Sequence, residues 1–388
     1  MTGRRYDVAP FACGIVCEYD PFHTGHAYQI RTVRETLALP VVCAMSGEYV
    51  QRAHVSCMDK RERAAIAVKN GASVVLEIPF PYACMSAERF AAAGVAVLDG
   101  SGMCSHIAFG AECTDTDALT QLADYLLTKE CADAVARCQK SAPNVSYAAA
   151  RTSVLEKRFG AEAAQIITQP NNILAVEYIK AIRRRGSTLI PVALERTVSR
   201  ADASDGVYAS SSYIRTLIGE GRLDEARRFM PDECTPEIKT DAALCRAVFT
   251  ALAVKKREAF ADIAECGGGL GDKLYKALQK AGSYEQTLAL MRCKTLTDAK
   301  IRRMMLFAYF GITTARAGQP VRYTPVLAYA DTDEARALFA LSRKNKTITV
   351  CASAAAIKHD KACASDYEAA EIASKMYRVL RDETDAAD

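Results

Sequence analysis

Short apolar segments of strand length alternate with longer segments of helical character over residues 1–200. The apolar segments span residues 12–17, 40–45, 73–78, 105–109 and 188–194. Segments with helical spacing or helix-capping residues follow or separate them at residues 27–37, 59–68, 86–98 and 170–186. Because the apolar segments are continuous, they favour strands that are buried on both faces of a sheet. The pattern therefore predicts an α/β fold with a Rossmann-like parallel sheet covered by helices.

The pattern changes after residue 220. Residues 221–388 are predicted to be mainly helical, with one small α/β element. In that element a strand after Arg322 is followed by a helix over residues 331–341 and a strand over residues 347–350. A chain of 388 residues is long enough for two or three domains. We therefore expect a sheet-based domain over residues 1–220 and a mainly helical domain over residues 221–388.

Composition excludes several classes of protein. Hydrophobic residues make up 50% of the chain and charged residues 25%, which is typical of a soluble globular protein. No segment approaches the apolar length that a membrane span needs, and residues 1–5 do not lead into an apolar signal segment. The 15 cysteines are scattered and include no C-x-x-C pair. We therefore expect no metal site and no disulfide framework, but a protein of the reducing cytoplasm.

The most informative stretch is the turn between the first predicted strand and the first predicted helix. It contains His23, Gly25 and His26 directly after a turn with a proline. Unpaired backbone N–H groups at a helix N-terminus favour anions, Gly25 leaves room for a ligand near the backbone, and both histidines can donate to phosphate oxygens. The His-x-Gly-His spacing after a strand is the adenylylation signature of the nucleotidyltransferase superfamily, so it predicts nucleotide binding. The alternative is that the two histidines only cap the helix.

Further loops are expected to meet at this turn. In a parallel sheet the ligand lies at the carboxyl ends of the strands. The His-x-Gly-His turn, the loop over residues 46–52 and the loop at Gly110 all follow predicted strands. Ser211 and Arg215 lie where a later helix begins and are candidates for a second phosphate contact, although serines in that position are often ordinary N-caps.

Positive charge is distributed unevenly. The charges of residues 1–220 cancel, so the net charge of +4 belongs to residues 221–388. The segment 292–322 contains seven basic residues and one acidic residue, interleaved with aromatic residues. This composition suits contacts to nucleic-acid phosphates and stacked bases, and Lys300, Arg302 and Arg303 are the candidate contacts. A solvated helix face with aromatic residues in the core would explain the same pattern.

These features occur together in one known family. The stretches that carry the resemblance are residues 18–26 (EYDPFHTGH), 45–52 (MSGEYVQR), 59–64, 77–80 (EIPF), 109–112 (FGAE), 170–178 and 209–215 (ASSSYIR). Together they resemble the bacterial tRNA(Met) cytidine acetate ligase family, which belongs to the nucleotidyltransferase superfamily, over nearly the whole chain. The resemblance implies a catalytic Rossmann-like domain and a helical part that helps to bind tRNA. It also implies that acetate and ATP form acetyl-adenylate, whose acetyl group passes to N4 of the wobble cytidine of elongator tRNA(Met).

The resemblance also implies a set of site residues. It gives His23 and His26 the catalytic roles. The ATP-binding residues that it implies are Val16, Cys17, Glu18, Tyr19, Asp20, Pro21, Phe22, Thr24, Gly25, Gln29, Gly110, Asn171, Asn172 and Arg196. Ser211 and Arg215, the candidates for a second phosphate contact, complete the expected ATP site. The chain has Asp20, Thr24 and Ala111 where the family usually has Asn, Asn and Ser. A carboxylate at Asp20 would either repel the triphosphate or help to hold Mg²⁺.

The chemistry implied by this resemblance depends on positioning in its first step. The acetate carboxylate is already anionic, so its attack on the α-phosphorus needs oriented donors and neutralised charge, with Mg²⁺ expected to bridge the triphosphate. In the second step a neutral amine attacks, and the sequence identifies no base for it. His54 and His106 are expected to be structural. The expected partners are ATP, acetate and tRNA, with neither a membrane nor DNA.

Two other functions remain open at this point. An adenylyltransferase that acts on a small metabolite would account for residues 1–220, but it would leave the basic segment without a role. A catalytically weakened RNA-binding homologue is the second alternative, because Asp20 replaces an asparagine of the family. The glycine-rich residues 267–273 lack the Gly-Lys-Ser/Thr of a phosphate loop and predict only a turn.

Overall fold

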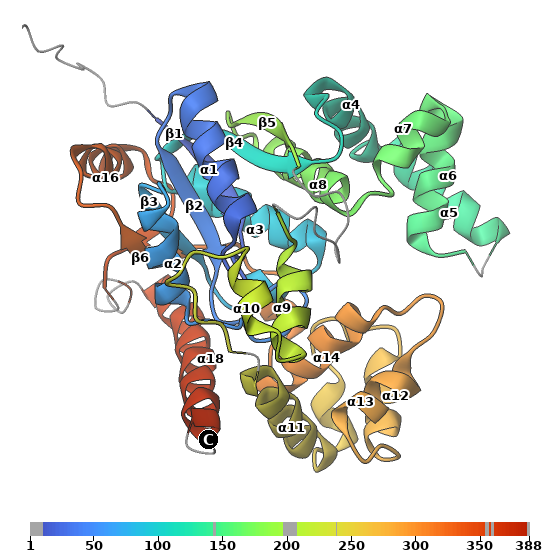
Figure 1. Ribbon diagram of the computed structural model, residues 1–388. Coiled ribbons are helices and arrows are strands. Elements are labelled where there is room, and N and C mark those ends of the chain that lie inside the picture. Colours follow the sequence, from blue (N-terminus) through green and yellow to red (C-terminus); the bar gives the residue numbers. More distant parts are fainter. Residues whose placement is uncertain are drawn as a thin grey trace, which may run out of the picture.

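A seven-stranded sheet forms the centre of the molecule (Figure 1). The computed structural model describes residues 11–142, 145–196, 208–237, 239–353, 357 and 361–385. Its strands are β1 Ala12–Cys17, β2 Val41–Ser46, β3 Val74–Ile78, β4 Cys104–Ala111, β5 Ile190–Glu195, β6 Tyr323–Tyr329 and β7 Thr349–Cys351, in the order β5-β4-β1-β2-β3-β6-β7. Neighbouring strands pair in parallel, except that β6 is antiparallel to β3.

Both faces of the sheet are buried, because each of the strands β1–β6 contributes to two hydrophobic cores. In β2, Val42 and Ala44 belong to one core, whereas Val41, Cys43 and Met45 belong to the other. Helices α3 Ala87–Gly100 and α8 Pro170–Arg185 cover the first face, and α1 Thr24–Leu37, α2 Lys60–Lys69, α9 Ser211–Gly219 and α10 Leu223–Arg227 cover the second. The predicted Rossmann-like fold class is confirmed.

Local sequence signals place several of these helices. The Asp59 carboxylate accepts from Arg61 N at 2.7 Å and begins α2, and Gly186 has φ 63° directly after α8. Close packing also requires glycine, because a Cβ at Gly14 would lie 2.6 Å from Leu98 of α3. Small residues therefore allow α3 to lie directly on β1.

Two groups of helices extend from this core. Helices α4 Thr116–Leu126, α5 Lys129–Ser141, α6 Tyr147–Phe159 and α7 Ala161–Ile166 form one group, and α11 Lys239–Ala253, α12 Leu270–Leu278, α13 Tyr284–Met291, α14 Asp298–Phe310 and α15 Thr314–Ala317 form the other. They lie at the upper and lower right of Figure 1. Within the described ranges, no helix has the length and apolar character needed to cross a membrane.

The C-terminal α/β element is part of the central sheet. Strand β6 pairs with β3, and helix α16 Asp333–Asn345 connects β6 to β7 at the edge. The order of strand, helix and strand agrees with the sequence pattern, but the pattern does not reveal the pairing with β3. The sheet therefore contains strands from both sides of the expected domain boundary at residue 220, and that boundary stays a prediction.

Helix α18 Lys361–Asp385 packs against the loop that follows β2. The Tyr49 hydroxyl donates to Ala373 O at 3.1 Å, and the Ser374 hydroxyl donates to Glu48 Oε1 at 2.9 Å. Lys60 Nζ lies 3.2 Å from Glu48 Oε1 and 2.9 Å from Glu77 Oε1. A buried polar cluster thus attaches α18 to this loop.

Arg63 is fully buried and connects three backbone segments. Its Nε donates to Met58 O at 3.2 Å, and its two terminal nitrogens donate to Glu18 O and Gly47 O. These carbonyls lie just after β1, just after β2 and just before α2. One guanidinium therefore fixes the loop after β1 relative to both ends of the loop between β2 and α2.

We expect Arg63→Met to destabilise the protein by about 3 kcal/mol, because it leaves buried carbonyl groups without donors. The free energy of unfolding from denaturant titration measures the effect. Arg61→Met is the matched control, since the Arg61 side chain is exposed on the same helix and should change stability by less than about 0.5 kcal/mol. Equal stabilities of the two variants would contradict this account of Arg63.

Candidate functional site

A cavity of about 640 Å³ opens at the carboxyl ends of β1 and β4. The chain crosses from one side of β1 to the other between β3 and β4, so the cavity lies at the topological switch point of the sheet. Most of the expected ATP-binding residues line it, together with both expected catalytic histidines: Val16, Cys17, Glu18, Tyr19, Asp20, His23, Gly25, His26, Gln29, Gly110, Asn171, Arg196, Ser211 and Arg215. The structure therefore brings together residues that are far apart in sequence.

Four of the expected residues lie behind this wall. Phe22 is fully buried and packs against the ring of Tyr19, with 4.8 Å between ring centroids. Pro21 offers its carbonyl to the Ser211 hydroxyl at 3.4 Å, and Thr24 N donates to a carbonyl just after α10. Asn172 accepts from Glu112 N and Cys113 N, both at 2.9 Å. These four residues shape the loops that line the cavity.

The His-x-Gly-His turn forms the N-terminus of α1. His23 Nδ1 accepts from Gly25 N at 3.1 Å, and His26 Nδ1 accepts from His23 N at 3.3 Å. The two rings stack with their centroids 3.6 Å apart. The capping alternative is therefore observed, and it coexists with a position on the cavity wall.

Both histidines are neutral at physiological pH. Burial, together with the positive charge of Arg196, lowers the pKa of His23 to about 3. Burial, the neighbouring His23 and Arg196 also hold the pKa of His26 well below its usual value. Because each Nδ1 accepts a hydrogen bond, the single ring proton is on Nε2. Each ring can therefore donate one hydrogen bond from Nε2.

Arg196 approaches the cavity from the end of β5. Its guanidinium donates to Asn171 Oδ1, and the Asn171 amide donates to Glu112 Oε1. The other oxygen of Glu112 accepts from Asn172 N at 2.9 Å, at the start of α8. This chain of contacts ties the arginine to the start of α8 and to the end of β4.

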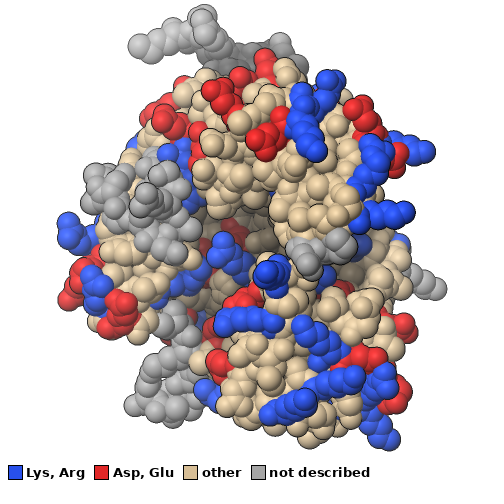
Figure 2. Space-filling view, turned by 90° about the vertical axis from the view of Figure 1, so that its right-hand side faces the viewer, with Lys and Arg blue, Asp and Glu red and all other residues tan. Residues whose placement is uncertain are grey.

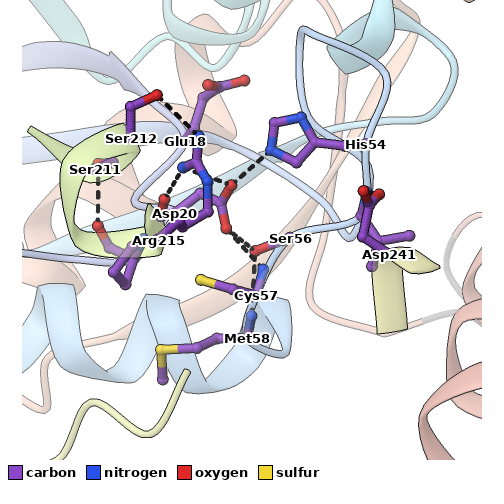
Figure 3. Close-up of polar contacts among 12 residues, drawn as sticks. Glu18, Asp20, His54, Ser56, Cys57, Met58, Ser211, Ser212, Arg215 and Asp241 are labelled. Atoms are coloured by element: carbon purple, nitrogen blue, oxygen red, sulfur yellow. Dashed lines mark hydrogen bonds and ion pairs between the residues drawn. The ribbon is translucent and has the colours of Figure 1, made fainter. Parts of the chain in front are cut away.

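Asp20 is buried among hydrogen-bond donors (Figure 3). Its Oδ1 accepts from Cys57 N at 2.7 Å and the Ser56 hydroxyl at 3.0 Å. Its Oδ2 lies 2.9 Å from His54 Nε2 and 3.1 Å from the Arg215 guanidinium. Burial raises the pKa of Asp20, but the hydrogen bond from His54 and the charge of Arg215 outweigh that effect and hold the pKa well below its usual range. The carboxylate is ionised and engaged in this network at both oxygens.

Sequence reasoning missed part of the cavity wall. His54, expected to be structural, lines the cavity beside Arg52, and the apolar rings of Phe90, Phe109 and Tyr178 line another part. Phe109 and Tyr178 lie in stretches that the family resemblance includes, so that resemblance was the available signal. His54 has no comparable local signal, because its role depends on a contact with Asp20 across 34 residues.

The three candidate tRNA-binding residues lie on α14, away from the cavity wall. Arg303 is buried, and its Nε donates to Glu265 at 3.2 Å. Lys300 lies 4.0 Å from Glu265, and the Arg302 guanidinium stacks 5.7 Å from the centre of the Tyr284 ring. Lys300 and Arg302 remain partly exposed, whereas Arg303 is directed inward.

The described part of the chain has no group of three or more His, Cys, Asp or Glu side chains arranged to hold a metal ion. The carboxylate nearest the turn, Asp20, already accepts from four donors. Asp20 is therefore committed to protein contacts rather than open to an ion.

Fold and site together define a nucleotidyltransferase. A model of the HIGH nucleotidyl transferase family matches residues 11–388, and the chain belongs to that family. Among curated proteins it is similar to tRNA(Met) cytidine acetate ligases. It is 32% identical to the ligase from Thermoanaerobacter sp. (strain X514), in an alignment that covers 77% of this chain and 78% of the relative. It is also 32% identical to the ligase from Syntrophotalea carbinolica, in an alignment that covers 76% of this chain and 73% of the relative. The resemblance noted from the motifs is confirmed.

Solved structures agree with this assignment. The crystal structure of Thermotoga maritima TmcAL bound with alpha-thio ATP has a TM-score of 0.87 to this chain and 25% sequence identity. The superposition covers 96% of this chain and 95% of the Thermotoga chain. The apo form of the same Thermotoga protein has a TM-score of 0.88 with the same coverage.

The neutral state of the two histidines predicts a pH dependence of stability. An unfolded histidine takes up a proton near pH 6.5, whereas folded His23 resists protonation down to about pH 3. The unfolded state therefore binds more protons between these values, and the free energy of unfolding should fall as the pH falls through this range. We expect His23→Gln and His26→Gln to reduce this fall. Denaturant titrations at neutral and mildly acidic pH measure it, and an equal fall in wild type and both variants would contradict the prediction.

Proposed function

We propose that this chain is an adenylate-forming ligase that activates acetate with ATP and acetylates N4 of the wobble cytidine of elongator tRNA(Met). The observation that carries the proposal is the cavity at the switch point, where two neutral histidines and two arginines surround a helix N-terminus. The names of the curated relatives support the reaction, and the ATP analogue bound to the Thermotoga protein supports ATP as the substrate.

Adenylate formation would use this cavity as an anion site. The Nε2–H groups of His23 and His26 would donate to the α-phosphate, and the positive end of the α1 dipole would favour its negative charge. Arg196 and Arg215 would offset the charge of the triphosphate from two sides. Mg²⁺ would accompany ATP on its phosphate oxygens, as this ion usually does. The acetate oxygen would then attack the α-phosphorus and release pyrophosphate.

The tRNA would bind across the helical side of the molecule. Figure 2 shows a hollow on this face, and Lys and Arg side chains gather below it at the level of α11–α14. In this part Lys276 and Lys294 are exposed, and neither makes an ion pair with the described residues. We propose that Lys276, Lys294, Lys300 and Arg302 contact tRNA phosphates, and Arg303 is left out because it is buried.

Incubation of the protein with tRNA, ATP and isotope-labelled acetate should produce labelled N4-acetylcytidine, which mass spectrometry of digested tRNA detects. We expect His23→Ala and His26→Ala each to slow this reaction by about 100- to 1000-fold, because each removes a donor to the reacting phosphate.

His106→Ala is the matched control, since His106 lies on β4 outside the cavity wall and should leave the rate unchanged. Circular dichroism verifies that all variants are folded. A stable adenylylated metabolite without acetylcytidine would instead establish the metabolite adenylyltransferase. Wild-type rates in both site variants would refute the proposed site.

Replacement of Lys276, Lys294 and Lys300 together by alanine should weaken tRNA binding. It should also flatten the salt dependence of affinity by about one unit of slope for each lysine–phosphate interaction that the substitutions remove. In the control variant, Arg343, Lys344 and Lys346 are replaced together by alanine. These substitutions remove the same amount of positive charge from exposed positions near the end of α16. Electrophoretic mobility shifts over a series of salt concentrations measure the tRNA affinity and its salt dependence. The same slope in both triple variants would show that tRNA binds elsewhere.

A further inference from the structure

Asp20 and His54 form an aspartate–histidine pair on the cavity wall, and the adenylate formation proposed above gives His54 no role. His54 comes from the loop between β2 and α2, and Asp20 comes from the loop after β1. Figure 3 shows the His54 ring directed at the Asp20 carboxylate, with Nε2 2.9 Å from Oδ2. The His54 side chain is 17% exposed and lines the cavity, whereas Asp20 is 2% exposed. The pair therefore connects a buried anion to the space where substrates would bind.

The loop that carries His54 is held in place from several sides. Tyr49 and Val55 form a β-bridge that closes it, and Val55 N donates to Asp241 Oδ1 of α11 at 3.0 Å. The next two residues, Ser56 and Cys57, donate to Asp20 Oδ1. The position of His54 relative to Asp20 is therefore fixed before any substrate arrives.

The hydrogen-bond pattern defines the tautomer of neutral His54. The ionised Asp20 carboxylate requires a donor, so the ring proton is on Nε2 and the lone pair is on Nδ1. In the described part of the chain no hydrogen bond to His54 Nδ1 occurs. In His23 and His26, by contrast, each Nδ1 already accepts from a backbone N–H. Of these three cavity histidines, His54 alone offers an unoccupied acceptor nitrogen.

The transfer step needs such an acceptor. The lone pair of an exocyclic cytosine amine is delocalised into the ring, so the amine is a weak nucleophile and must lose a proton as it acylates. An imidazole suits this task near neutral pH, and a carboxylate behind it stabilises the imidazolium that forms. His54 and Asp20 have this arrangement.

We propose that His54 is the proton acceptor of acetyl transfer and that Asp20 is its positioning residue; this inference rests on the proposed ligase function. The N4 lone pair forms a bond to the acetyl carbonyl carbon. The bond between that carbon and the phosphate oxygen of AMP breaks, and its electron pair leaves with AMP. The N4 proton moves to Nδ1 of His54, while Nε2–H remains hydrogen-bonded to Asp20.

Separate assays of the two half-reactions test this step. Acetate-dependent exchange of labelled pyrophosphate into ATP reports adenylate formation without tRNA. Single-turnover transfer from preformed acetyl-adenylate to tRNA reports the second step. We expect His54→Gln to leave exchange within about twofold of wild type and to slow transfer by about 100-fold or more. Asp20→Asn should slow transfer by a smaller factor than His54→Gln does. His106→Gln is the matched control and should leave the rates of exchange and of transfer unchanged.

One further readout distinguishes proton transfer from a structural role. The charged groups around His54 are Asp20 and Glu18 from the first loop, Arg215 from α9 and Asp241 from α11 (Figure 3). Added imidazole should accelerate transfer by His54→Ala and have no effect on the wild type.

Normal transfer by His54→Gln would overturn the proposal. Equal loss of exchange and transfer would also overturn it, because His54 would then serve the adenylate site or the fold. Absence of acetate-dependent exchange in the wild type would refute the proposed ligase function itself, which is a distinguishable result.

Discussion

The buried guanidinium of Arg63 is the constraint on which the site depends. It is the largest fully buried side chain among the described residues, and its three hydrogen bonds all go to backbone carbonyls. Removing a permanent charge from water is costly, and partial dipoles offset that cost only when all of them are in place. The carbonyls of Glu18, Gly47 and Met58 therefore have to converge together, and the loops that carry them supply much of the cavity wall.

The hydrogen-bond donors and positive charges of the cavity are each held in place by a neighbouring side chain, and they do not form a dense cluster of charge. Asn171 holds Arg196, Asp20 holds Arg215, and the two stacked histidines are neutral. Donors fixed in this way do not reorganise when charge develops on a phosphate, which is the condition for electrostatic stabilisation of a transition state. The aspartate at position 20 thus acts as an anchor for an arginine, and its own charge is balanced before a nucleotide arrives.

Much of this arrangement could be predicted from the sequence, and the remainder could not for a physical reason. Continuous apolar runs identify β1–β5, and Asp59 and Gly186 mark helix ends, because these signals are local. The pairing of β6 with β3 has no local signal, since hydrophobic periodicity shows which face is buried but not which strand lies beside it. The same limit hid the inward turn of Arg303 and the contact of His54 with Asp20, each of which depends on a partner distant in sequence.

Helix α18 shows how this long-range order affects the growing chain. The Tyr49 hydroxyl bonds to Ala373 across 324 residues, and Ser374 completes the cluster around Glu48 and Lys60. During synthesis, domains generally fold from the N-terminal side, and contacts between distant segments form slowly. The loop that carries Gln51, Arg52 and His54 lacks this support until α18 has left the ribosome. A nascent chain can therefore pair β1–β5 before β6 and β7 are synthesised, but its substrate cavity reaches its final shape only after α18 has emerged.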